Sequence, residues 1–282
     1  MCAAYSCEYR GEKMVLKTPL QDSSHYDIAA NDIEVEMLLL NQLHHQNIVG
    51  LKGAGMLPDG RRFIVLEFLS GGTLSSRLRG KNMMPMAKSD VYEKALELSN
   101  ALEYLHDLAV PGRIVTHRDL KPDNIAIAAD GKFKILDFGL GKIMRRKFRV
   151  RSAKCKMTGG TGSLRYMAPE VATHKKYNEM VDVYSFSLIL WEMLAGVKPF
   201  ERLKCNDYYN HVVDRDLRPA LDPSWPPEIR NMLTSCWSGD PDERLSFREI
   251  SAILQVVAED HHKSDFVAEK RASVHRIPTE GS

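Results

Sequence analysis

The chain lacks the apolar segments that signal peptides and membrane spans require. Its first residues, MCAAYSCEYRGEKM, contain no apolar core, and an uncharged apolar run of about 20 residues occurs nowhere. The most apolar stretch, residues 180–195, includes Asp182 and Glu192. It therefore predicts a helix buried inside a globular domain. We expect a protein without a membrane span, in an intracellular, cytoplasmic location.

A paired cysteine pattern and an excess of charge are also missing. The five cysteines include no CxxC pair, which favours free thiols over a disulfide framework or a zinc site. The 39 Lys and Arg residues nearly balance the 37 Asp and Glu residues, so the composition gives no reason to expect nucleic acid as a partner. The sequence contains no internal repeat, and it does not indicate the oligomeric state.

The 282 residues that are present divide into two parts of different character. Up to residue 69, short β-like runs alternate with turns, and apolar spacing predicts one helix over residues 32–43. From residue 70 to residue 258 the spacing is mostly helical. Residues 259–282 are polar and aperiodic, which predicts a disordered tail. The sequence thus predicts an α+β fold in one domain, with a small β-rich lobe (1–69) and a larger α-helical lobe (70–258).

Two polar motifs stand out in the second part, HRDLKPDN at 117–124 and DFG at 137–139. At this spacing they resemble the catalytic loop and the metal-binding motif of protein kinases. Phosphoryl transfer requires a hydroxyl in line with the γ-phosphate of ATP and neutralisation of charge by Mg²⁺. The resemblance implies that Asp119 orients or accepts the hydroxyl proton and that Lys121 reaches the γ-phosphate. It also implies that Asn124 and Asp137 bind Mg²⁺, and Lys121 is typical of Ser/Thr kinases.

The resemblance extends into the first lobe. MVLK at 14–17 is similar to the kinase strand that carries the ATP-anchoring lysine. Lys17 is therefore expected to pair with Glu36, with Glu34 as the rival partner. IVLEFLSGG at 64–72 resembles the kinase hinge, which implies that backbone groups of Glu67 and Leu69 bind adenine.

Downstream, GSLRYMAPE at 162–170 is similar to the end of a kinase activation segment and places Ser163 near the catalytic residues. By the same resemblance, Asp182 braces the backbone of the catalytic loop and Glu170 pairs with Arg244. The likeness covers about residues 4–257 and is closest to the tyrosine-kinase-like group of Ser/Thr kinases. It implies a protein as the substrate.

A basic segment precedes this motif. Between residues 141 and 156 the chain has eight Lys or Arg residues and no acid, and Thr158 and Thr161 follow. One interpretation is a solvated, mobile loop. The other is that Arg118 and the basic residues receive a phosphate on Thr158 or Thr161, which orders the segment. Both stay open at the level of the sequence.

One kinase motif is missing, the glycine-rich GxGxxGxV loop that covers the ATP phosphates. The sequence starts in the strand that follows this loop, as an incomplete piece of a longer kinase or as a truncated form. An active protein Ser/Thr kinase is the leading interpretation because the residues for phosphate, metal and proton are present. A pseudokinase acting as a scaffold is the alternative. A small-molecule phosphotransferase is a third, which the MAPE segment disfavours.

Overall fold

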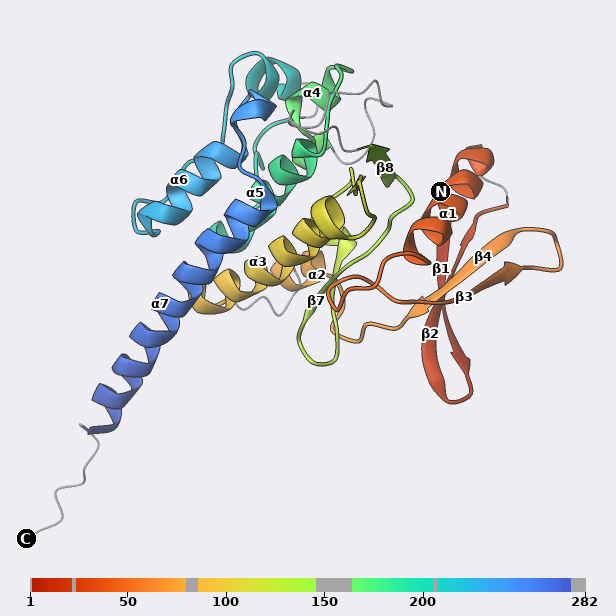
Figure 1. The fold of residues 1–282 in the computed structure, drawn as a ribbon, viewed down its shortest axis with the longest axis horizontal. Coiled ribbons are helices and arrows are strands. Elements are labelled where there is room, and N and C mark those ends of the chain that lie inside the picture. The colour runs from red at the N-terminus through yellow and green to blue at the C-terminus, as the bar shows by residue number, and fades with distance from the viewer. Residues whose placement is uncertain (1, 22–23, 80–85, 146–163, 205–206, 275–282) are drawn as a thin grey trace, which may run out of the picture.

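The molecule has a small lobe built on a β-sheet and a larger helical lobe (Figure 1). The structure is a computed structural model that describes residues 2–21, 24–79, 86–145, 164–204 and 207–274, with side chains as far as residue 261. The elements of the small lobe are β1 (Cys2–Tyr9), β2 (Glu12–Pro19), α1 (Tyr26–Leu40), β3 (Leu51–Met56) and β4 (Arg62–Glu67). Its four strands pair antiparallel in the order β1-β2-β4-β3. The predicted two-lobed α+β fold is confirmed.

Strand register places the key side chains of the small lobe on one face of the sheet. Lys17 lies opposite Ala4 on one side and opposite Ile64 on the other. Val15 lies opposite Leu66. Because alternate residues of a strand face opposite sides, these five residues share a face. Ala4, Val15, Lys17 and Leu66 line the cleft between the lobes, so this face forms the roof of the cleft.

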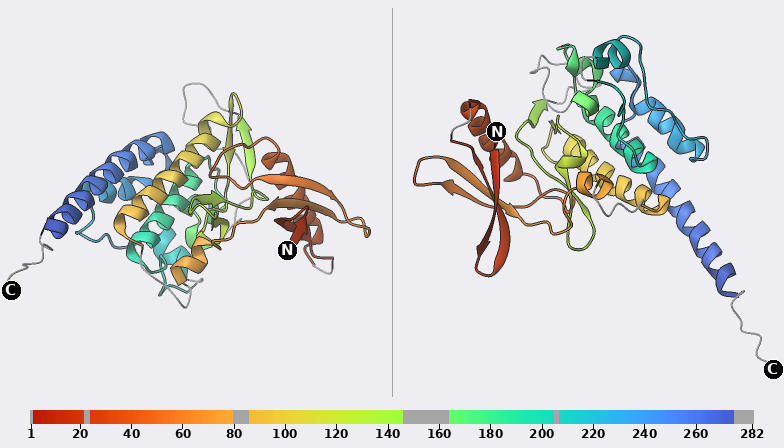
Figure 2. Two further views of the ribbon diagram at one scale, coloured as in Figure 1. Left: turned by 90° about the horizontal axis from the view of Figure 1, so that it is seen from below. Right: turned by 180° about the vertical axis from the view of Figure 1, so that it is seen from behind.

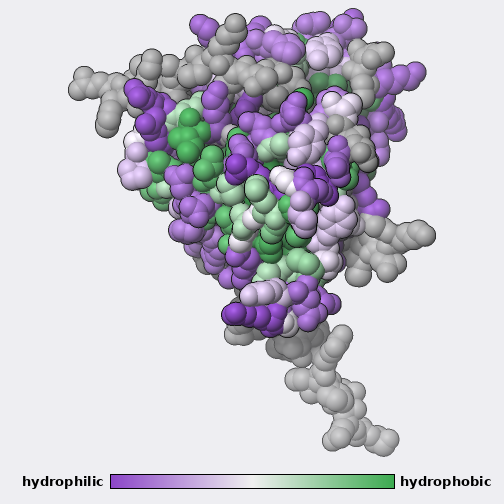
Figure 3. All heavy atoms as spheres, turned by 90° about the vertical axis from the view of Figure 1, so that its right-hand side faces the viewer, coloured by the Kyte–Doolittle hydropathy of each residue, from purple (hydrophilic) through white to green (hydrophobic). Residues whose placement is uncertain are grey.

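Apolar surface remains exposed elsewhere on the small lobe. Figure 3 views the molecule from this side and shows apolar patches among polar side chains. The large apolar side chains that stay exposed in the described part of the small lobe are Tyr5, Tyr9, Ile28, Leu38, Met56 and Phe68. The lobe thus buries mainly the surfaces that meet α1 and the cleft.

Helix α1 packs against β2 and β4. The helix was predicted over residues 32–43. It starts six residues earlier than predicted, at Tyr26, and ends three residues earlier than predicted, at Leu40, so both predicted boundaries were wrong. The buried residues Ala29, Ile33 and Leu40 follow a helical spacing. Ala29 is too small to have marked the first turn in the sequence, and Leu43 is buried from the turn that follows the helix.

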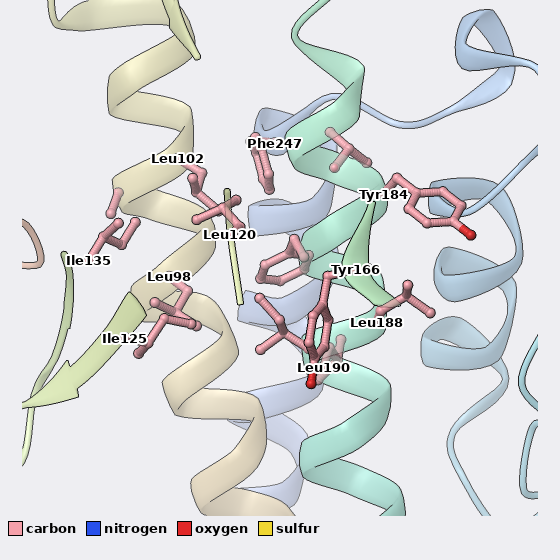
Figure 4. Close-up of a cluster of buried hydrophobic side chains, with 14 of the residues drawn as sticks. Leu98, Leu102, Leu120, Ile125, Ile135, Tyr166, Tyr184, Leu188, Leu190 and Phe247 are labelled. Atoms are coloured by element: carbon pink, nitrogen blue, oxygen red, sulfur yellow. The ribbon is translucent and has the colours of Figure 1, made fainter. Parts of the chain in front are cut away.

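The large lobe surrounds a helical core. Its helices and strands are α2 (Leu74–Arg79), α3 (Lys88–Glu103), the π-helical turn η1 (Tyr104–Leu108), β5 (Arg113–Thr116), η2 (Pro122–Asn124), β6 (Ile125–Ile127), β7 (Phe133–Ile135), β8 (Lys142–Arg145), η3 (Leu164–Tyr166), α4 (Pro169–Ala172), α5 (Met180–Ala195), the π-helical turn η4 (Tyr209–Val213), α6 (Pro227–Cys236), η5 (Pro241–Glu243) and α7 (Phe247–Val274). Leu98 and Leu102 of α3, Leu188 and Leu190 of α5 and Phe247 of α7 belong to this core, and Leu188 lies on the side of α5 that points away from α3 (Figure 4). Almost every residue of α5 is buried, as its apolar sequence predicted.

Helix α7 extends well beyond the core. It begins with a capping box, in which the Glu249 carboxylate accepts hydrogen bonds from the amide and hydroxyl of Ser246. The helix then continues to Val274 and projects from the body of the molecule (Figures 1 and 2). The predicted disordered tail from residue 259 is therefore corrected as far as Val274. No Gly or Pro interrupts this stretch, and Gln255 donates an i,i+4 hydrogen bond to Glu259.

Candidate active site

A cleft between the two lobes gathers most of the predicted site residues. Its volume is about 320 Å³, which lies within the range of small-molecule sites. Six predicted residues are among those that line it, namely Lys17, Glu36, Glu67, Leu69, Asn124 and Asp137. The apolar side chains of Val15, Leu66 and Leu136 form part of the wall, so the cleft offers an apolar slot with polar groups at one end.

The polar end is organised by Lys17. Its ammonium lies 2.7 Å from Oε2 of Glu36 on α1 and 2.9 Å from Oδ1 of Asp137. Burial disfavours the charged ammonium, but the two carboxylates outweigh it and raise the pKa of Lys17 above its ordinary value. The predicted pair of Lys17 with Glu36 is confirmed. The rival Glu34 instead forms an ion pair with Arg62, at 2.9 Å.

The surroundings of Asp137 favour the ionised form of its side chain. Burial alone would raise its pKa, yet the nearby Lys17 ammonium lowers the pKa of Asp137 below its usual value. Its backbone has φ = 60°, and the next side chain, Phe138, is fully buried. The rings of Phe138 and His117 meet edge to face with centroids 4.9 Å apart. With Phe138 anchored in the core, Asp137 borders the cleft.

The catalytic-loop residues form a second polar cluster. Nζ of Lys121 lies 2.6 Å from Oδ2 of Asp119. The amide nitrogen of Asn124 donates to the backbone oxygen of Asp119 at 2.9 Å and to its Oδ2 at 3.1 Å. Asn124 also lines the cleft beside Asp137. The structure thus brings the three predicted residues of this loop together next to the Lys17 cluster.

Asp182, at the start of α5, holds the backbone of this loop. Its carboxylate accepts hydrogen bonds from the amides of His117 and Arg118, both at 2.8 Å, and lies 3.0 Å from Nε2 of His106. Complete burial would raise its pKa, but the interactions with His106, His117 and the Arg118 amide lower the pKa of Asp182. Arg118 has φ = 71°, a strained conformation that these hydrogen bonds help to maintain. The bracing role predicted for Asp182 is confirmed by this geometry.

The segment that joins the lobes runs close to β6. The Gly71 amide donates to the Ile127 carbonyl and the Ile127 amide to the Gly72 carbonyl, both at 2.9 Å. A Cβ atom on Gly71 would lie 2.7 Å from the side chain of Ile127 and 2.8 Å from its carbonyl oxygen. Gly72 has φ = 72°, which favours glycine. The two glycines of the predicted hinge therefore allow the chain to cross beside the cleft.

Buried ion pairs fix the far end of the activation segment. Arg244 forms the predicted pair with Glu170, and the structure shows that the pair is bidentate, with N–O distances of 2.7 and 2.9 Å. A further network was not predicted. Arg79 of α2 donates to Oε1 of Glu192 at 2.6 Å and to the Tyr166 hydroxyl at 3.0 Å, and the Tyr166 hydroxyl bonds Oε2 of Glu192. The one available signal was the acidic Glu192 within an apolar helix.

Some predictions fall on residues that the structure does not describe. Ser163, Thr158, Thr161 and most of the basic segment lie outside the described residues. Arg118 lies within them, and its guanidinium bonds the hydroxyl of Tyr177 at 2.9 and 2.6 Å and the Leu140 carbonyl at 3.0 Å. Cys2, Cys7 and Cys236 are free thiols, as expected.

The cleft residues fit a Mg²⁺ ion. Asp137 offers an ionised carboxylate, and both hydrogen bonds of Asn124 to Asp119 use its amide nitrogen, which leaves its carbonyl oxygen for a cation. In the described part of the chain, no cluster of three or more His, Cys, Asp or Glu side chains could hold a metal alone.

Comparison with known proteins agrees with the site geometry. Residues 3–254 match the family described as protein kinase domain. The chain is 34% identical to the serine/threonine-protein kinase VIK of Arabidopsis thaliana over 260 residues, which cover 90% of this chain and 58% of that protein. It is 34% identical to the serine/threonine/tyrosine-protein kinase HT1 of the same plant, over 78% of this chain and 53% of HT1. Identity to mitogen-activated protein kinase kinase kinase 7 of Drosophila melanogaster is 30%, over 83% of this chain and 33% of that protein.

This chain thus spans little more than half the length of these relatives, or less. Within the described residues, no helix is both long enough and apolar enough to cross a membrane. The family match extends over most of the sequence and includes every cleft residue described above. The chain therefore belongs to the protein kinase family.

Proposed function

We propose that this chain is a protein serine/threonine kinase that transfers the γ-phosphate of ATP to Ser and Thr hydroxyls of a protein substrate. The observation that carries the proposal is the position of Lys17, whose ammonium contacts both Glu36 of α1 and Asp137 of the large lobe. One cation thus joins the roof of the cleft to the proposed metal ligand. A buried cation in a cleft, with a pKa that two specific carboxylates raise, is typical of a functional site.

The proposed roles follow from the positions of the side chains. Lys17, held by Glu36, binds the α- and β-phosphates of ATP, and Asn124 and Asp137 hold Mg²⁺. When bound, Mg²⁺ neutralises the charge that develops on the phosphate oxygens. Backbone groups of Glu67 and Leu69 bind the adenine edge, at the end of the cleft that the apolar side chains line.

Asp119 and Lys121 act at the acceptor hydroxyl in this proposal. The Asp119 carboxylate accepts or orients the hydroxyl proton, so that the oxygen faces the γ-phosphate. The Lys121 ammonium, 2.6 Å from Asp119, is close enough to stabilise negative charge on the transferred group. ATP and protein substrates are available in the cytoplasm, so we also propose a cytoplasmic location.

The test is transfer of labelled γ-phosphate from Mg-ATP to a generic basic protein. We compare the wild-type chain with Asp119→Asn and with a control, Asp130→Asn, in the exposed turn between β6 and β7. Removing the proton acceptor should reduce transfer by about 10²-fold or more, whereas the control should keep wild-type activity. Equal transfer by the wild-type and Asp119→Asn chains would contradict the proposal. No transfer by any chain, with ATP still bound, would support the scaffold alternative instead.

A further inference from the structure

The side chain of Glu67 is occupied on the side of β4 that faces away from the cleft. Leu66 lies on the cleft face, opposite Val15, so the next side chain along the strand points to the opposite face. There, Oε1 of Glu67 accepts a hydrogen bond from the Gly50 amide at 2.7 Å and another from the Lys134 ammonium at 2.6 Å. The main chain of Glu67 is thus the part that borders the cleft.

Gly50 and Glu67 are joined twice. Besides the bond to the carboxylate, the Glu67 amide donates to the Gly50 carbonyl at 3.0 Å. A Cβ atom on Gly50 would lie 3.3 Å from Oε1 of Glu67, so the carboxylate sits directly against the Gly50 backbone. Two hydrogen bonds in a small ring fix the orientation of the Glu67 peptide better than either bond alone.

Lys134 connects this ring to the large lobe. It lies on β7, three residues before Asp137 in the sequence. The same strand is tied to the small lobe nearby, because the Val49 amide donates to the Ile135 carbonyl at 3.0 Å. Lys134 therefore belongs to the strand that leads into the proposed metal ligand, while Glu67 belongs to the strand that leads into the proposed adenine contact.

We propose that Lys134 is a positioning residue for nucleotide binding: through its ion pair with Glu67 it sets the adenine contact of the hinge relative to Asp137. The proposal rests on the proposed function of the cleft. Lys134 touches neither substrate nor metal in this account. Side-chain exposures of 18% for Lys134 and 22% for Glu67 mean that water screens this pair less than it screens a surface pair.

The test measures ATP affinity by titration calorimetry together with KM and kcat, on the full chain. Lys134→Met keeps the aliphatic stem of the side chain but removes the charge. We expect the Kd and KM for ATP to rise about fivefold, as for the loss of a partly buried ion pair, with kcat within twofold of wild type. Lys134→Arg should restore ATP affinity. The matched control is Lys132→Met, whose side chain is exposed two residues earlier and should leave affinity unchanged.

Two results would overturn the proposal. One is an ATP affinity of Lys134→Met equal to that of the wild type. The other is a rise in kcat, which would make the ion pair a brake on the enzyme rather than a positioning device. Calorimetry distinguishes a failure of this proposal from a failure of the proposed function. If the wild-type chain binds ATP but transfers no phosphate, the ATP affinities of the wild type and Lys134→Met can still be compared. A wild-type chain that does not bind ATP would overturn both.

Discussion

The buried ion pair between Arg244 and Glu170 provides a stringent test of how the activation segment is anchored. Arg244 is completely buried. Besides its two bonds to Glu170, it donates to the carbonyls of Met180 and Ser238, both at 3.0 Å. Replacing Arg244 by Met preserves much of the volume but leaves the Glu170 carboxylate buried without its partner.

The expected loss is large because the remaining charge is desolvated. Removing one member of a buried ion pair costs about 3–5 kcal/mol of unfolding free energy. In a Glu170→Gln background the same Arg244→Met change leaves a neutral amide in place of a buried charge, which lowers the cost to about 1–3 kcal/mol. The two substitutions should therefore be non-additive by about 2 kcal/mol in a double-mutant cycle.

Urea unfolding followed by circular dichroism and tryptophan fluorescence measures these differences. Arg248→Met is the control, because Arg248 is exposed one turn further along the chain and should lose less than about 0.5 kcal/mol. A loss below about 1 kcal/mol for Arg244→Met, or the same loss in both backgrounds, would refute the reasoning that charge burial dominates at this site.

Three further predictions concern the cleft and its support. Glu36→Gln should raise the KM for ATP about tenfold, since Lys17 loses a charged partner. The control Glu34→Gln should leave the KM and kcat unchanged, and equal effects of the two substitutions would contradict the assignment of Glu36 as the partner of Lys17. Gly71→Ala should destabilise the fold by about 1–3 kcal/mol in thermal melts, because the new methyl group overlaps β6, whereas Gly53→Ala, in open space, should cost less. The lowered pKa of Asp182 stabilises the fold above the usual carboxyl pKa of 3.8, and this contribution is lost as the pH falls through the folded pKa. Acid unfolding curves should therefore be flatter for Asp182→Asn than for the wild type, and parallel curves would count against this linkage.

The sequence predicted the parts of the site that local motifs specify. The catalytic loop, Asp137 and Lys17 each lie in a short segment whose residue order is distinctive. The resemblance to protein kinases implied that Lys17 pairs with Glu36, with Glu34 as the rival, and the structure shows the pair with Glu36. The choice between Glu36 and Glu34 depended on the position of α1 against the sheet, which the sequence does not specify.

Contacts between distant segments were beyond the sequence. Arg79 and Glu192 are 113 residues apart, and Glu67 and Lys134 are 67 apart. Taken alone, each of these residues is an ordinary charged side chain that is more often solvated than paired. Only the tertiary fold brings the end of α2 to Glu192 of α5, and the hinge to β7.

Helix ends were the other weak point. The tail from residue 259 was predicted to be disordered because it is polar and aperiodic, yet α7 continues through it to Val274. The first half of α7 packs against the core and nucleates the helix. Because the residues that follow include no glycine or proline, their helix propensity is enough to continue it. The spacing of apolar residues indicates which face of a helix is buried. A part of a helix that extends beyond the core has no buried face, so its sequence lacks this spacing.

We propose above that this chain transfers phosphate to protein Ser and Thr hydroxyls, with Lys17 binding the phosphates of ATP in the cleft. The most direct measurement incubates the chain with Mg-ATP and a mixture of Ser, Thr and Tyr peptides and identifies the modified residues by mass spectrometry, for the wild type, Lys17→Met and the exposed control Lys13→Met. We expect phosphoserine and phosphothreonine with the wild type and the control, and neither with Lys17→Met. Phosphate found mainly on Tyr, or product that is unaffected by Lys17→Met, would contradict it.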